Sequence, residues 1–180
     1  MNEKELENIR SRADAKLRYA KVYLNELVSK KIHDGSDGER AHAESFLYHL
    51  FGAKDAFLHE LNIYYGANLP EESISPGKLR KKLKEIGKKS SELAEFHLLE
   101  SDENSWLSIA KIMRDVSTHV QGVKRSFHLG GPLDQQVFLK HPNTLIDVTG
   151  YYVQDFEKWY KNMSSLLDRL RESALKANNL

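Results

Sequence analysis

The sequence reads YVQDFEKWYKNMSSLLDRL over residues 152–170, and this stretch decides the fold. Large apolar side chains recur in it at alternating intervals of four and three residues, at Tyr152, Phe156, Trp159, Met163, Leu166 and Leu170. These intervals bring the side chains onto one face of an α-helix, almost in the heptad pattern of helices that pack against other helices. A face so rich in large apolar groups should not remain in water. The stretch therefore predicts a last helix, over about residues 151–176, whose seam is buried by a helical bundle or by a second subunit.

Three upstream segments show the same helical period, over about residues 3–30, 39–65 and 104–121. A short basic helix is expected to begin at Ser75 and Pro76, because serine is a good N-cap and proline loses nothing at the first helical position. Amphipathic segments bury their stripes against one another, and the short loop between the first two favours antiparallel neighbours. We therefore expect an all-α fold, an antiparallel bundle of four to five helices.

The helical period disappears at about residues 123–149, before the last helix. Two apolar runs in this region, VFL and LIDV, flank the segment KHPNT. Such a pattern predicts a small β-hairpin with Pro142 and Asn143 at its turn, and an irregular insertion is the alternative. Because 180 residues suit one domain, we expect the insertion to belong to a single helical-bundle domain over residues 1–180.

Composition excludes several classes of site. The chain has no cysteine, which excludes disulfides, thiolate metal sites and cysteine nucleophiles. It contains no Gly-rich phosphate loop, dinucleotide fingerprint or serine-nucleophile elbow. It shows neither a signal peptide nor an apolar run of the roughly 20 residues that a membrane span needs. We therefore expect a cytoplasmic protein with no membrane partner and no cofactor.

Two polar features fall on the apolar side of the second predicted helix. His42, His49 and Glu60 share nearly one angular position, which would suit a metal, but the small residues among them favour a close helix contact. We expect no metal site. Lys54 lies amid phenylalanine and leucine positions, where a cation must reach out to solvent or pair with a carboxylate. We expect it to reach solvent at the edge of the bundle.

The sharpest functional clue is RDVSTH at residues 114–119. On a helical wheel, the arc opposite the apolar stripe of this segment is polar and holds Lys111, Arg114, Asp115, Thr118 and His119. Asp115 and His119 are four residues apart, so the carboxylate can orient the imidazole and raise its basicity. Arg114 presents a planar guanidinium that suits a phosphate. A solvated helix face with surface ion pairs is the alternative interpretation.

The motif resembles the marker of the HEPN superfamily, an arginine followed after four to six residues by a histidine, commonly with a polar residue directly after the arginine. Members of that superfamily are helical bundles, and their catalytic members dimerise to form a cleft that cuts RNA without metal. The resemblance implies phosphate binding by Arg114, general acid–base catalysis or 2′-hydroxyl activation by His119, and support by Asp115. It also implies RNA as a partner, a homodimer, and a role in bacterial defence or as a toxin.

A second candidate surface is the most basic stretch of the chain. Net charge is only +1, so an anion-binding surface must come from local clustering. The stretch contains one acidic residue, Glu85, and seven cations, which are Lys78, Arg80, Lys81, Lys82, Lys84, Lys88 and Lys89. The first five, with Lys111, are candidate nucleic-acid-binding residues, although no aromatic residue interleaves with them to stack a base. An acidic protein partner or a solvated face are the alternatives, so a non-catalytic interaction module stands beside the ribonuclease hypothesis.

Overall fold

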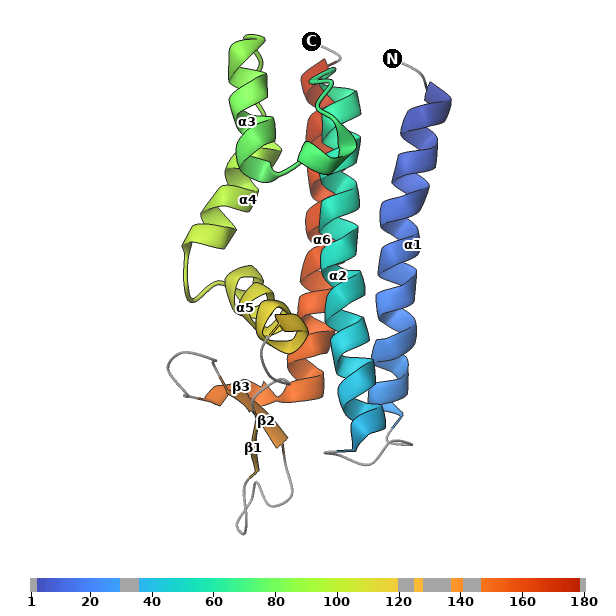
Figure 1. Cartoon of the computed structure of the whole chain (residues 1–180), viewed down its shortest axis with the longest axis vertical. Helices are drawn as coiled ribbons and strands as arrows, with labels where there is room; N and C mark the ends of the chain where they lie inside the picture. Colours follow the sequence, from blue (N-terminus) through green and yellow to red (C-terminus); the bar gives the residue numbers. More distant parts are fainter. Residues whose placement is uncertain (1–2, 30–35, 120–124, 128–136, 141–146, 179–180) are drawn as a thin grey trace.

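The three longest helices run side by side along the long axis of the structure (Figure 1). The computed structural model describes residues 3–29, 36–119, 125–127, 137–140 and 147–178. In chain order its elements are α1 (Glu3–Val28), α2 (Asp37–Tyr64), the 3-10 helix η1 (Glu71–Ser73), α3 (Pro76–Glu85), α4 (Ser91–Ser101), α5 (Trp106–His119), β1 (Arg125–Phe127), β2 (Val137–Lys140), β3 (Asp147–Tyr151) and α6 (Tyr152–Asn178). The predicted all-α helical bundle is confirmed.

The apolar seam of α6 is buried inside this bundle. Its described members are Phe156, Trp159, Met163, Leu166 and Leu170, and none is more than 4 % exposed. The Phe156 ring stacks on Phe46 of α2, with 4.6 Å between the ring centroids. As predicted from the short loop, α1 runs antiparallel to α2, whereas α6 runs in the same direction as α2 (Figure 1). The bundle of a single chain therefore buries the described part of the seam without a second subunit.

Serine side chains cap the N-termini of four described helices, α2, α3, α4 and α5. Ser36 Oγ accepts a hydrogen bond from the Glu39 backbone N–H, and Ser75 Oγ accepts one from Lys78. The predicted N-cap at Ser75, followed by Pro76, is confirmed. These bonds satisfy backbone donors that have no partner within the first turn of a helix. The starting points of α2 and α3 are thus set by local sequence.

Helix α4 was not predicted, and its apolar pattern explains why. Leu93 and Phe96 are buried, but Leu98 is 68 % exposed, so the apolar side chains of α4 point in several directions. A helix of this kind has no single stripe for a periodicity argument to detect. Its N-cap was the local sequence signal that could have located the start of α4. Ser90 Oγ accepts a hydrogen bond from the Leu93 N–H at 3.2 Å.

The insertion before α6 contributes a small antiparallel sheet in the order β1-β2-β3. Arg125 pairs with Leu139, and Lys140 pairs with Asp147 across an irregular register. The sheet lies beyond α5 at one end of the bundle, and β3 leads directly into α6 (Figure 1). The turn predicted at Pro142 and Asn143 lies outside the described residues.

Lys54 corrects one expectation from the sequence. Its side chain is buried, and its Nζ donates a 2.5 Å hydrogen bond to Glu100 Oε1 in α4. The expected position at the solvent edge is therefore wrong. The reason is again α4, which supplies the carboxylate that a buried cation needs.

Asp155 gives a pH prediction. Its carboxyl group is only 3 % exposed, and burial raises its pKa from 3.8 to about 6, although Lys158 opposes this shift. Because the folded state then holds the proton more tightly than the unfolded state, the stability that this group contributes is present below pH 4 and is lost as pH rises through 6.

We therefore expect Asp155→Asn to raise the free energy of unfolding by about 1–3 kcal/mol at pH 8 and to change it little at pH 4. Urea denaturation of both proteins at the two pH values measures the difference. An equal effect of the substitution at both pH values would contradict the buried, proton-binding carboxyl.

Candidate functional site

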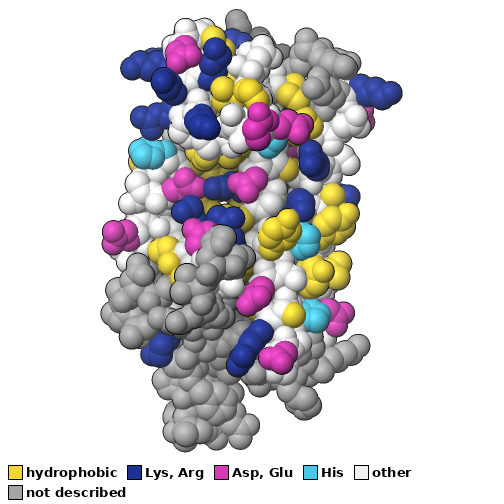
Figure 2. Space-filling model, in the orientation of Figure 1, with side chains coloured by type: hydrophobic (Ala, Val, Ile, Leu, Met, Phe, Trp, Pro, Cys, Tyr) yellow, Lys and Arg dark blue, Asp and Glu magenta, His cyan; other side chains and the backbone are white. Residues whose placement is uncertain are grey.

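A groove between α3 and α4 has a volume of about 960 Å³. One wall, formed by α3 and the turn after it, carries cations, and the other, formed by α4, is mostly apolar. The lining residues that matter here are Arg80, Lys81, Lys84, Lys88 and Lys89 on the first wall, and Leu93, Ala94, His97 and Leu98 on the second. Figure 2 shows the lysine and arginine side chains gathered at the end of the molecule where α3 lies.

Two buried leucines set the rotation of α3 and therefore the cationic wall. Leu79 and Leu83 face the bundle and are at most 1 % exposed. Successive residues of an α-helix are about 100° apart, so Arg80, Lys81 and Lys84 must point away from that buried side. The structure thus brings three of the five predicted basic residues of this stretch to the groove. Lys78 and Lys82 line a smaller hollow beside η1 instead, with Lys81 between the two.

The groove carries an excess of positive charge. No aspartate or glutamate is among its described lining residues. Lys88 Nζ donates a 2.8 Å hydrogen bond to the Tyr65 backbone oxygen at the end of α2. In the part of the chain that the structure describes, no ion pair engages Arg80, Lys84 or Lys89. These cations are available to a bound anion.

A buried carboxylate anchors the apolar wall. Glu92, in the first turn of α4, is fully buried and accepts hydrogen bonds from Tyr65 Oη at 2.8 Å and from Ser90 Oγ at 2.6 Å. Burial and the neighbouring Glu92 raise the pKa of the Tyr65 hydroxyl, which remains a donor. A carboxylate satisfied in this way ties α4 to the end of α2. The first turn of α4, which forms part of the groove, is therefore attached to the bundle.

The RDVSTH motif lies on α5, away from the residues that line the groove. The Arg114 guanidinium lies 5.0 Å from the centre of the Phe51 ring, and its Nε is 2.8 Å from Asp115 Oδ1. Lys111 Nζ approaches the other Asp115 oxygen at 3.4 Å. The structure thus brings together Lys111, Arg114 and Asp115 of the predicted site. His119 is the last residue of α5, and its side chain lies outside the described part of the chain.

His42 and His49 of α2 contact a tyrosine of α1, whereas Glu60 pairs with an arginine of α6. His49 stacks on Tyr23 at 5.5 Å, and the Tyr23 ring also contacts His42 edge-on. Glu60 is paired with Arg171 of α6. Among the described residues, no group of three or more histidine, aspartate or glutamate side chains is arranged to hold a metal ion.

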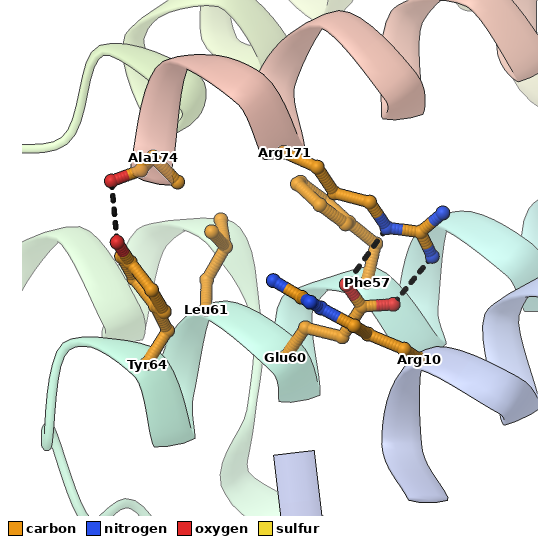
Figure 3. A pocket seen from close by; sticks show the side chains of 7 residues that line it. All are labelled: Arg10, Phe57, Glu60, Leu61, Tyr64, Arg171 and Ala174. Atoms are coloured by element: carbon orange, nitrogen blue, oxygen red, sulfur yellow. Dashed lines mark hydrogen bonds and ion pairs between the residues drawn. The ribbon is translucent and has the colours of Figure 1, made fainter. Parts of the chain in front are cut away.

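A polar cluster that no sequence pattern indicated joins α1, α2 and α6 (Figure 3). Arg171 donates to both oxygens of Glu60, at 2.6 and 3.0 Å, and to Asp14 Oδ1 at 2.8 Å. Burial raises the pKa of Glu60, and Arg171 and Arg10 oppose this shift. The cavity beside these groups measures about 10 Å³, which admits no more than about one water molecule. We interpret the cluster as a structural clamp.

A family model described as "Family of unknown function (DUF6586)" matches residues 8–176. The chain belongs to the DUF6586 family. No curated protein and no solved structure matches it. The DUF6586 match extends from α1 to α6, so the groove, the α5 motif and the insertion all lie within the span of the family. None of the described helices of this DUF6586 protein is long and apolar enough to cross a membrane.

Proposed function

We propose that the protein is a non-catalytic binding module whose α3–α4 groove captures an anionic partner with an apolar face. The observation that carries the proposal is the pairing of a cationic wall with an apolar wall around about 960 Å³. A cleft lined by one sign of charge concentrates ligands of the opposite sign. Burial of apolar surface on the second wall then supplies affinity that charge alone lacks in salt.

The lining of the groove favours binding over catalysis. His97 is the only described lining group of the kind that commonly transfers protons near neutral pH, and no carboxylate lines the groove beside it. A general acid–base site needs such a partner to orient the ring and balance its charge. The cations and leucines present are instead the groups that hold a ligand in place.

The anionic dye 8-anilinonaphthalene-1-sulfonate offers a direct test, because it combines a sulfonate with aromatic rings. We expect saturable binding that weakens about tenfold, or about 1.4 kcal/mol, in Arg80→Ala/Lys84→Ala, because the dye loses its counter-charges. The control, Arg18→Ala/Lys161→Ala, removes two exposed cations outside the groove. Fluorescence titration gives both affinities.

Equal dye affinity in the two double variants would contradict the proposal. Binding would then occur elsewhere, for example on the exposed tyrosines Tyr19 and Tyr48 of α1 and α2.

As the alternative to a non-catalytic role, we propose that the α5 motif carries out metal-independent RNA cleavage of the HEPN type. The support is that RDVSTH is helical and that Phe51 and Asp115 hold the Arg114 side chain in one orientation, as phosphate recognition requires. The pairing of Asp115 with His119, a second copy of the chain and an RNA substrate remain part of this proposal.

Cleavage of mixed RNA in the presence of EDTA tests this second function. We expect Arg114→Ala and His119→Ala each to reduce the rate at least about 100-fold, the range for loss of an acid–base or phosphate-stabilising group. Lys161→Ala is the control for altered surface charge. NMR titration of His119 shows whether its ring changes protonation near neutrality. An inactive wild-type protein, or variants as active as wild type, would remove the ribonuclease proposal and leave the groove proposal intact.

A further inference from the structure

We propose that the occupant of the α3–α4 groove is a short, acidic, amphipathic helix of a partner protein. This inference rests on the proposed binding function and names the class of partner. It is carried by the length of the groove, by the exposed Leu98 of its apolar wall, and by the spacing of its cations.

The groove is long enough to hold a short helix. It is lined along α3 from Gly77 to Lys84 and along α4 from Ser90 to Leu98. Each of these stretches covers roughly two turns, or about 12 Å of helix axis. A partner helix of about ten residues is roughly 15 Å long and about 10 Å wide with its side chains. Such a segment can lie along both walls at the usual spacing of packed helices.

The apolar wall offers anchoring positions for such a helix. Leu98 is 68 % exposed, so no other part of the described chain covers its side chain. Ala94 lies one turn earlier on the same side of α4, and its small side chain permits close approach of a second helix. Leu83 and Leu93 form the floor between the walls. A helix that presents apolar residues at intervals of three and four would bury Leu98 and Ala94, the exposed apolar groups of this wall.

The cationic wall requires acidic residues on the side of the helix next to its apolar stripe. Arg80 and Lys84 are four residues apart and therefore project from α3 one turn from each other. Glutamates four residues apart on a docked helix would meet them in register. Lys89 extends the positive charge beyond the end of α3. Charge and apolar surface thus select the same kind of segment.

The same lining disfavours RNA and a membrane surface. The described lining holds no phenylalanine, tyrosine or tryptophan, so His97 is its only ring on which a nucleobase could stack. A phosphate backbone against the leucine wall would lose water without gaining a polar contact. A lipid surface binds helices with a broad protruding apolar face, whereas Leu98 is the only large apolar side chain of the described lining that is exposed, because Leu83 and Leu93 are at most 2 % exposed.

Fluorescence anisotropy with a designed peptide tests the inference on the full chain. The probe is a labelled peptide of about 15 residues, helical by composition, with leucines at i, i+4, i+7 and i+11 and glutamates along the adjoining stripe. We expect Arg80→Glu/Lys84→Glu and Leu98→Asp each to weaken its affinity at least about tenfold. The matched control Arg18→Glu/Lys161→Glu should change affinity less than about twofold, because those cations lie outside the groove. Circular dichroism checks that each variant is folded.

Three further probes make the test decisive. A peptide of the same composition in scrambled order should bind at least about tenfold more weakly, because its apolar and acidic stripes are destroyed. A uridine oligonucleotide and vesicles with anionic lipid should not displace the designed peptide. Equal binding of the scrambled peptide, or displacement by either competitor, would overturn the inference. If the naphthalenesulfonate dye binds the groove and the designed peptide does not, the helical partner is wrong but the binding module stands; if neither binds, both proposals fail.

Discussion

Arg171→Ala is expected to lower the free energy of unfolding by about 3–5 kcal/mol, because the buried carboxylate of Glu60 loses the cation that donates hydrogen bonds to both of its oxygens. The side chains of Arg171 and Glu60 are 16 % and 4 % exposed, so water cannot replace the lost ion pair. Asp14 on α1 loses the same partner. Urea denaturation followed by circular dichroism at 222 nm, a wavelength that reports helix content, measures the change.

Two variants separate this explanation from a general sensitivity of α6. Arg169→Ala, two residues away, removes an exposed arginine that pairs with Glu95 at the surface, and we expect at most a small effect. Arg171→Met/Glu60→Met removes both buried charges and should recover most of the stability lost in Arg171→Ala. If Arg171→Ala were as stable as wild type, the clamp would not contribute to the stability of the fold.

Phe156→Ala is expected to cost about 3–5 kcal/mol, because it removes a fully buried ring at the contact between α2 and α6. The ring stacks on Phe46 and lies 5.4 Å from the Trp159 ring, so its loss leaves a cavity that two large neighbours must fill. For a chain of this size such a loss corresponds to roughly 10 °C in the midpoint of thermal unfolding. Differential scanning calorimetry measures both quantities.

Leu98→Ala is the matched control for the Phe156 substitution. It also removes a large apolar side chain from a helix, but this side chain is mostly exposed. The expected change in the free energy of unfolding is therefore within about 0.5 kcal/mol. A Phe156→Ala variant that melted with wild type would mean that the α6 seam is not the main hydrophobic contact of the bundle.

The cationic wall of the candidate groove could be predicted from residues that are near one another in sequence. Ser75 and Pro76 located the start of α3, and the cations that follow predicted an anion-binding surface. The sequence did not show which cations would share a site, because Lys78 and Lys82 differ from Arg80 and Lys84 only in their angle around the helix. That angle decides which cations line the groove, because Leu79 and Leu83 pack against the bundle and α4 forms the second wall.

By itself the sequence determined the helices with a clear apolar stripe, the serine cap of α3 and the all-α class, because each depends on neighbours within one or two turns. Tertiary structure alone decided the path of α4, the carboxylate that neutralises Lys54 and the clamp at Arg171. Arg171 and Glu60 lie 111 residues apart, and no local period relates them. Their pairing arises because helix packing brings two buried charges together, where each lowers the cost of burying the other.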